Sequence, residues 1–301
     1  MSYNISSDNL SNPLLKELLQ EIIDFFISVD SEFYVIGATA RDIIMSGIHA
    51  QHSGRKTNDL DIAIAIPDWD RYQEISDQLC RKVGFTKSKE QKQRFCYKNI
   101  YMLDIVPFGE VAKADKYIYW PPEESFAMPV HGFVEMAKDA LEVTIDNSLI
   151  IRVASLPGIF ILKLVAWHDR HLVHDRDAED MAFIISNYLS LNDERAALDH
   201  YDIFDSTPFS TFVAGATLMA RDIKALIRDD LSVRERIATI LIEELSKTLD
   251  SPIINQMLET HQSLKYEEVY DALLSMTNEL TNKIWLNLKK PKKKLYSMIT
   301  R

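Results

Sequence analysis

Cysteine is scarce in this sequence: the 301 residues include only Cys80 and Cys96. Two thiols are too few for a disulfide framework or for a zinc site built from cysteines. The sequence also lacks an uninterrupted apolar run of the roughly 18 to 20 residues that a membrane-spanning helix needs. Residues 1–20 show neither the basic flank nor the apolar centre and cleavage site of a signal peptide. We therefore expect a reduced, cytoplasmic protein that does not associate with membranes.

A net positive charge is missing as well. The formal net charge is −11 at pH 7, so non-specific attraction to nucleic acid is not the default expectation. Basic residues are nevertheless concentrated in residues 287–301, where no acidic residue occurs. Two interpretations of this segment remain open, a solvated tail and an arm that contacts phosphate groups.

The chain changes character near residue 155. Before that point, helical patterns such as residues 12–29 alternate with short β-rich runs at residues 33–37, 60–66 and 100–109. After it, the patterns are helical to the end of the chain, and no internal repeat is evident. We predict an α+β protein with a mixed sheet flanked by helices in residues 1–155. An all-α domain with a basic tail is predicted in residues 156–301.

Two aspartates stand two residues apart at the start of an apolar strand, in the segment "TNDLDIAIAI". Residues at positions i and i+2 of a strand face the same way, so Asp59 and Asp61 point to a common region. Asp104 lies in a second apolar strand, "YMLDIVPF". Three carboxylates on neighbouring strands are the hard oxygen ligands that suit Mg²⁺ or Mn²⁺. Aspartates at strand ends can also simply point to water, although a buried, unpaired Asp104 would be costly.

A strand-to-helix turn precedes the two aspartates. The run "FYVIG" ends at Gly37, and a helical pattern starts at once with Ala38 and Thr39. Such a turn exposes backbone N–H groups to an anion, and glycine allows a phosphate to approach closely. Two basic residues nearby, Arg41 and Arg55, are further candidates for phosphate contacts; exposed surface charge is the alternative for both.

These residues resemble the signature of the polymerase-β-like nucleotidyltransferases. That family has a glycine followed by glycine or serine at a strand–helix turn, then Asp-x-Asp/Glu, then a third carboxylate on a later strand. Gly37, Asp59, Asp61 and Asp104 match it, whereas Ala38 departs from it and lacks a side-chain contact to phosphate. The resemblance implies metal-dependent transfer of a nucleoside monophosphate from an NTP, with release of pyrophosphate. It also implies that the three aspartates hold the ions and that Asp104 takes the proton of the acceptor hydroxyl.

The second half resembles the abortive-infection AbiEii/AbiGii-type nucleotidyltransferase toxins. In those, a helix bears a lysine and then an arginine, and a Lys-Asp-x-x-Asp-Leu pattern opens the next helix. The corresponding positions are Lys163, Arg170, Arg176-Asp177 and Asp180, with arginine in place of lysine at 176 and methionine in place of leucine at 181. The resemblance covers roughly residues 33 to 190. It implies that Lys163 neutralises nucleotide phosphates, that a tRNA 3′ end is an acceptor, and that an antitoxin protein restrains the enzyme.

Several alternatives remain open from the residues themselves. Lys163 lies on an apolar helix, where a lysine commonly extends its ammonium group to the surface. Trp120, beside two prolines, is a candidate for stacking on a base or for anchoring a loop. At the level of function, the alternatives are adenylylation of a small molecule or protein, and a catalytically silent domain that binds a partner.

Overall fold

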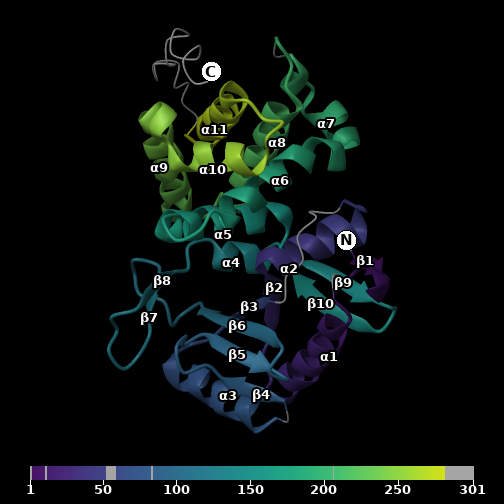
Figure 1. Cartoon of the computed structure of the whole chain (residues 1–301), viewed down its shortest axis with the longest axis vertical. Helices are drawn as coiled ribbons and strands as arrows, with labels where there is room; N and C mark the ends of the chain where they lie inside the picture. The colour runs from purple at the N-terminus through teal and green to yellow at the C-terminus, as the bar shows by residue number, and fades with distance from the viewer. Residues whose placement is uncertain (1, 11, 52–58, 83, 206, 282–301) are drawn as a thin grey trace. The chain divides into compact units, whose positions relative to one another are not determined.

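The computed structural model describes the chain except for residues 1, 11, 52–58, 83, 206 and 282–301 (Figure 1). By its internal packing the chain divides into two compact units, Met1–Leu162 and Lys163–Arg301. The domain boundary near residue 155, which the change in sequence character suggests, remains a proposal. In the described part of the chain, none of the helices has the length and apolar character needed to cross a membrane.

The first unit is built on a mixed sheet. Its eight strands lie in the order β1-β9-β10-β2-β3-β6-β5-β4, and the central pair β3 and β6 is parallel while β2 and β3 are antiparallel. A separate hairpin is formed by β7 and β8. The strands are β1 (Ser2–Ile5), β2 (Phe33–Ile36), β3 (Asp59–Ala65), β4 (Phe85–Lys87), β5 (Arg94–Tyr97), β6 (Tyr101–Phe108), β7 (Tyr117–Tyr119), β8 (Ala127–Pro129), β9 (Leu141–Ile145) and β10 (Leu149–Val153).

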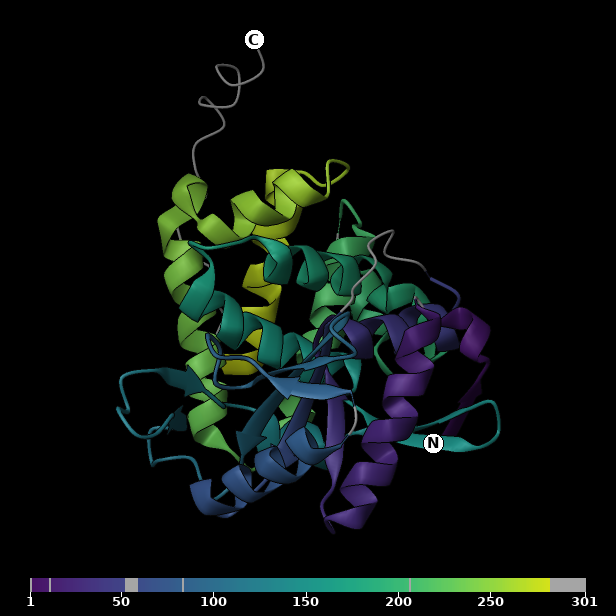
Figure 2. The ribbon, with the colours of Figure 1, turned by 60° about the horizontal axis from the view of Figure 1, so that its bottom comes forward.

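Helices accompany this sheet: α1 (Pro13–Ser28), α2 (Gly37–Asp42), a π-helical turn (Ile43–Ile48), α3 (Trp69–Arg81) and α4 (Phe133–Lys138). The starts of α1 and α3 follow from their capping residues. The Asn12 side chain accepts a hydrogen bond from the backbone of Leu14, and Asp68 accepts one from Arg71. The two helices lie side by side (Figures 1 and 2), and Lys82 beyond α3 contacts Glu21 of α1 at 3.4 Å.

The second unit consists of helices in its described residues. They are the later part of α5 (Leu156–Arg170), α6 (Arg176–Leu191), α7 (Asp193–Asp199), α8 (Thr211–Leu226), α9 (Leu231–Lys247), α10 (Pro252–Thr260) and α11 (Tyr266–Thr281), with short 3₁₀ turns between some of them. Fully buried aliphatic residues such as Ile185, Met219 and Leu273 form its core. The predicted fold class, a mixed sheet with helices followed by an all-α half, is confirmed.

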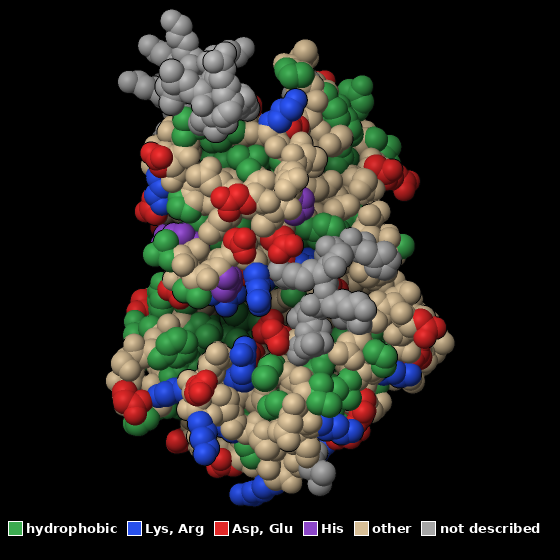
Figure 3. Space-filling view, viewed as in Figure 1, with side chains coloured by type: hydrophobic (Ala, Val, Ile, Leu, Met, Phe, Trp, Pro, Cys, Tyr) green, Lys and Arg blue, Asp and Glu red, His purple; other side chains and the backbone are tan. Residues whose placement is uncertain are grey.

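Figure 3 shows how charged side chains are distributed over one face of the molecule. On the face drawn in Figure 3, acidic and basic groups are interspersed, with hydrophobic side chains between them. The net charge of −11 is therefore not gathered in a single acidic patch on that face.

The contact between α6 and α8 depends on one glycine. A Cβ atom added at Gly215 of α8 would lie 2.6 Å from the backbone oxygen of Ile185 in α6. Real Cβ atoms do not approach so closely, and a backbone oxygen cannot rotate away as a side chain can. The absence of a side chain at Gly215 therefore allows the two helices to pack at this distance.

We expect Gly215→Ala to lower the free energy of unfolding by about 2 kcal/mol, because it overpacks this helix contact. The loss should appear even though alanine favours a helix over glycine by about 1 kcal/mol. Gly158→Ala is the matched control, since its Cβ would meet the flexible Met136 side chain at 3.1 Å. Urea titrations followed by circular dichroism measure both variants, and equal stability of the two would contradict this account of the packing.

Candidate active site

The two faces of the sheet have different neighbours. Tyr97 of β5 donates a hydrogen bond to Glu17 of α1 at 2.7 Å, and the Lys87 ammonium lies 5.1 Å from the ring centre of Tyr72 in α3. Because successive strand residues point to opposite faces, α1 and α3 cover the face that contains Lys87, Phe95 and Tyr97. The alternating residues of β5, which include Arg94, point to the other face.

The predicted carboxylates lie on this other face. In the parallel pair of β3 and β6, Asp61 is directly opposite Asp104, and Asp59 is opposite Met102. Asp59 and Asp61 are half-buried, and Asp104 is only 9% exposed. Burial raises the pKa of nearby Tyr101, and the charges of Asp59 and Asp61 raise it further. The structure therefore brings the three aspartates together on adjacent strands.

A basic residue that the sequence reasoning missed pairs with Asp104. Arg94 is opposite Asp104 in the antiparallel pair of β5 and β6. Its guanidinium donates from Nε to one Asp104 oxygen at 2.8 Å and from Nη2 to the other at 2.7 Å. This hydrogen bonding to Asp104 raises the pKa of Arg94, and the charges of Asp59 and Asp61 act in the same direction. Arg94 is thus the internal counter-charge of the carboxylate group.

The strand–helix turn lies against Asp61. Gly37 has φ +68°, and a Cβ atom added there would lie 2.3 Å from Asp61 Oδ2. Any other residue at this position would be strained and would also displace the carboxylate. The Thr39 hydroxyl donates to the backbone oxygen of Asp59 at 2.8 Å, which ties the start of α2 to β3.

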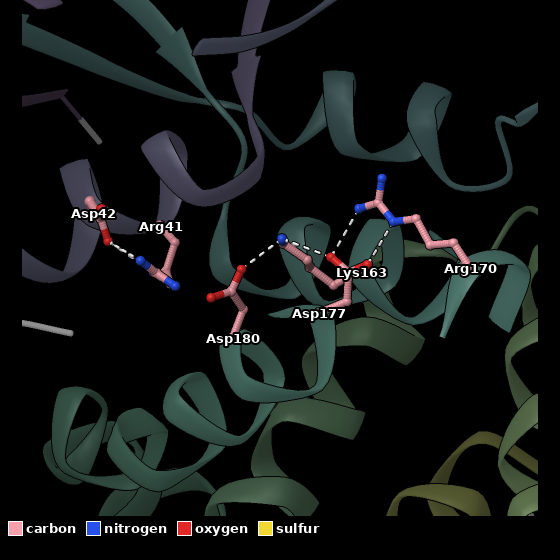
Figure 4. Close-up of polar contacts among 6 residues, drawn as sticks. All are labelled: Arg41, Asp42, Lys163, Arg170, Asp177 and Asp180. Atoms are coloured by element: carbon pink, nitrogen blue, oxygen red, sulfur yellow. Dashed lines mark hydrogen bonds and ion pairs between the residues drawn. The ribbon is translucent and has the colours of Figure 1, made fainter. Parts of the chain in front are cut away.

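The remaining candidates of the first unit are placed as follows. Ala38 is buried at the start of α2. Arg41 is also buried, and its Nε donates to Asp42 Oδ1 at 2.9 Å, as Figure 4 shows. An exposed phosphate-binding arginine is therefore not what the structure shows at position 41. Arg55 lies outside the described residues.

The residues of the second motif form a buried ionic cluster within the second unit (Figure 4). The Lys163 ammonium lies 2.9 Å from Asp177 Oδ1 and 2.6 Å from Asp180 Oδ2. Arg170 donates to both oxygens of Asp177, at 2.8 and 3.0 Å. Lys163 is 9% exposed, so it does not extend to the surface as an apolar setting would have suggested. We refer to Lys163, Arg170, Asp177 and Asp180 as the Lys163 cluster.

The protonation states in this cluster depend on the ion pairs. Burial opposes the charge of Lys163, but the carboxylates of Asp177 and Asp180 outweigh it and raise the lysine pKa. Burial likewise opposes ionisation of Asp177, and the charges of Lys163 and Arg170 outweigh it and lower the pKa of that carboxyl group. Lys163 and Asp177 are therefore charged at neutral pH, and the charge of each depends on its partners.

Among the described residues, no group of three or more His, Cys, Asp and Glu side chains is arranged to hold a metal ion. Both Asp104 oxygens accept hydrogen bonds from Arg94. Mg²⁺ often binds through one or two carboxylates together with substrate phosphates, and Asp59 and Asp61 on one strand face fit that requirement.

Comparison with known proteins decides the family. A family model described as nucleotidyl transferase AbiEii toxin, type IV toxin–antitoxin system, matches residues 25–273. The chain belongs to the AbiEii nucleotidyltransferase toxin family. The match spans most of the chain and confirms the resemblance to the AbiEii-type toxins. As a member of the AbiEii family, the chain is a nucleotidyltransferase of a toxin–antitoxin system.

Similarity to solved structures is weaker. The antibiotic-resistance factor ANT(2″)-Ia is 14% identical, with a TM-score of 0.35, over 62% of this chain and 95% of that chain. A CCA-adding enzyme in complex with ATP is 14% identical, with a TM-score of 0.27, over 98% and 90%. The Thermotoga maritima CCA-adding enzyme complexed with tRNA is 12% identical, with a TM-score of 0.24, over 98% and 89%. The comparison with curated proteins finds no match.

We expect Gly37→Ala to abolish activity of this AbiEii family member and to destabilise it, because a methyl group there displaces Asp61. Gly109→Ala separates the two effects. Gly109 also has positive φ, at +96°, but the nearest atom to its added Cβ is 3.4 Å away. The control should show only backbone strain, about 1 to 2 kcal/mol. Nucleotide transfer and urea unfolding are measured on both; comparable activity in the two variants would contradict a role for the close approach.

We expect Asp177→Asn to lower the free energy of unfolding by about 3 to 5 kcal/mol, because it leaves buried Lys163 with half of its counter-charge. Asp222→Asn is the control, since its pair with Arg195 is partly exposed and should contribute about 1 kcal/mol. The lowered pKa of Asp177 adds a pH signature. Its stabilisation is present above the ordinary value of 3.8 and is lost as pH falls below it, so wild type and Asp177→Asn should converge in acid.

Proposed function

We propose that this protein transfers a nucleoside monophosphate from an NTP to a hydroxyl acceptor in a metal-dependent reaction. The observation that carries the proposal is the placement of Asp61. Its carboxylate lies on the same strand face as Asp59 and so close to Gly37 that only glycine fits there. A backbone turn that can approach a phosphate is thus held beside two carboxylates that can hold a cation.

The proposed ligands of Mg²⁺ or Mn²⁺ are Asp59 and Asp61. A divalent ion bound there would neutralise phosphate charge and orient the reacting groups, which is the main requirement of phosphoryl transfer. The backbone N–H groups at Gly37 and Ala38 are the proposed contacts to the NTP phosphates. Ala38 contributes no hydroxyl group, so this contact would be made by the backbone alone.

Asp104 has a different proposed role from that of the other two aspartates. Each of its oxygens accepts one hydrogen bond from Arg94, so part of its acceptor capacity is already used within the protein. We assign it a positioning role, in which it holds Arg94 beside Asp59 and Asp61. The charge of Arg94 would then lower the repulsion between these aspartates and an incoming polyphosphate. A ligand or general-base role would use the lone pairs of Asp104 that Arg94 leaves free.

Lys163 is proposed to bind nucleotide phosphate, and this role rests on the resemblance of its motif to the toxin family. The contacts of the Lys163 cluster support a fixed position for the ammonium group, because two carboxylates hold it. Asp177 and Asp180 are then positioning residues that act through Lys163, and Arg170 completes the charge balance around Asp177.

The proposed acceptor is the 3′ end of an RNA such as tRNA, and the proposed protein partner is an antitoxin. The family description, a type IV toxin–antitoxin system, supports the second. The net charge of −11 favours a second candidate, a cationic small molecule such as an aminoglycoside, which an acidic protein attracts.

We expect Asp61→Ala to reduce transfer by more than about 100-fold, since it removes a proposed metal ligand. Purified protein is incubated with radiolabelled NTPs, Mg²⁺ and total RNA, and labelled products are resolved by electrophoresis. Asp70→Ala, which removes an exposed carboxylate of α3, is the control and should label like wild type. Equal labelling by wild type and Asp61→Ala, with both folded by circular dichroism, would end the proposal.

The same assay distinguishes the acceptors. Label on RNA supports the first candidate, and label on an added aminoglycoside or on a protein supports adenylylation of that molecule. Calorimetry with MgATP and MgCTP covers the remaining case. If neither nucleotide binds, the domain is a catalytically silent binding protein.

A further inference from the structure

A hollow of about 210 Å³ lies in the first unit, apart from the carboxylates. We call it the tryptophan–lysine pocket and define it by Trp69, Tyr72, Lys87, Lys89, Lys92 and Trp120, which are among its lining residues. Trp69 and Tyr72 belong to α3, the lysines to the end of β4 and the turn after it, and Trp120 follows β7. The pocket is thus on the α3 side of the sheet, and neither Asp59, Asp61 nor Asp104 lines it.

Aromatic rings form one wall of the pocket. The ring centres of Trp69 and Trp120 are 4.9 Å apart, and that of Tyr72 lies 5.1 Å from Trp120. Trp120 is only 2% exposed, and its indole N–H has no hydrogen-bond partner among the described residues. Buried tryptophans usually find such a partner, so this wall has an unsatisfied donor beside a stacking surface. Trp120 therefore lines the pocket with an almost fully covered ring, packed against Trp69 and Tyr72.

Two lysines of the pocket, Lys87 and Lys89, supply positive charge that no ion pair within the described residues neutralises. Half-buried Lys87 donates to the Ser76 hydroxyl at 2.7 Å and lies over the rings of Tyr72 and Phe95. Burial lowers the pKa of Lys87, which the nearby charge of Asp77 offsets only in part. In the described part of the chain, no ion pair joins Lys87 or the exposed Lys89 to a carboxylate.

Lys92 differs from these two. It donates to the backbone oxygen of Pro121 at 2.7 Å and to Glu123 at 2.6 Å, which closes one side of the pocket. Lys87 and Lys89 are therefore the two cations that remain for a ligand. The chain as a whole has a net charge of −11 and does not attract anions in general. Binding of an anion in this pocket would therefore depend on these two lysines.

Stacking rings beside uncompensated lysines match one ligand class. An aliphatic ligand would not need the lysines, and a simple anion would not need the indoles; a nucleotide needs both, since its base stacks on aromatic rings and its phosphate pairs with cations. We propose that the tryptophan–lysine pocket binds one nucleotide of a single-stranded RNA. Its base lies against Trp69, which Trp120 supports from behind, and its phosphate lies at Lys87 and Lys89.

A second hollow, of about 260 Å³, lies next to this pocket. It shares Lys87 and Ser88 with the tryptophan–lysine pocket, and Arg94 also lines it. Arg94 is the partner of Asp104. An RNA strand held in the pocket can thus continue past Ser88 toward the carboxylates, which assigns the pocket to a nucleotide upstream of the reacting end. This assignment rests on the proposed function in taking RNA as the acceptor.

The test is RNA binding without transfer. Lys89→Glu and Trp69→Leu are compared with wild type by the fluorescence anisotropy of a fluorescein-labelled single-stranded RNA of about 12 nucleotides. We expect each variant to weaken binding on the order of tenfold. Lys138→Glu, which makes the same charge change at an exposed position of α4, is the matched control and should bind like wild type. Lys89 is exposed, so Lys89→Glu keeps the test informative if Trp69→Leu fails to fold.

A parallel titration with AMP and MgATP distinguishes a strand from a mononucleotide. Weaker RNA binding with unchanged mononucleotide binding supports the proposal. Weaker mononucleotide binding with unchanged RNA binding overturns it, as does RNA binding that is unchanged in both variants. Asp61→Ala is included in the RNA titration and should bind normally. If transfer fails in every assay while the pocket variants still lose RNA, only the proposed function is contradicted.

Discussion

The pairing of Arg94 with Asp104 is the interaction on which the carboxylate site depends. Adjacent strands bring Asp61 and Asp104 into direct register, and two carboxylates so close repel each other unless a positive charge accompanies them. Arg94 supplies that charge from the next strand, through two hydrogen bonds of matched geometry. It makes a concentration of acidic groups on one sheet face compatible with folding, and it leaves Asp59 and Asp61 as the proposed ligands for a cation.

In the interior of the second unit, buried charges are likewise balanced by partners of opposite charge. Lys163 and Asp177 are both almost fully buried, and isolated charges there would be strongly unfavourable. Each has at least two partners of opposite charge, so the cluster is balanced and its geometry is defined. Buried ion pairs of this kind often contribute little net stability but make a specific arrangement necessary. That is the property a phosphate-binding lysine requires, since its position must not vary.

Much of the fold could be predicted because its signals are local. The caps of α1 and α3, the short apolar strands and the purely helical second half all follow from patterns of a few residues. Strands β1 and β9 pair with each other although they lie near opposite ends of the first unit's sequence, and they were not predicted. Strand β9 alternates apolar and polar residues over only five positions, and the four residues of β1 become a strand by pairing with β9. The pairing of Arg94 with Asp104 could have been predicted from the sequence. Both residues are equally distant from the hairpin turn at Asn99, so they lie opposite each other in the antiparallel pair.

By itself, the sequence determined the family, the fold class and the identity of the candidate groups, because spacing on a strand or helix decides which side chains share a face. It could not determine which groups satisfy one another. Only the tertiary structure showed that Asp104 is neutralised by Arg94, that Arg41 is buried against Asp42, and that Lys163 is held by two aspartates. It also placed the tryptophans and lysines of the pocket together from three separate segments. The physical reason is that ion pairing and burial depend on distances between elements, and these distances are set by packing.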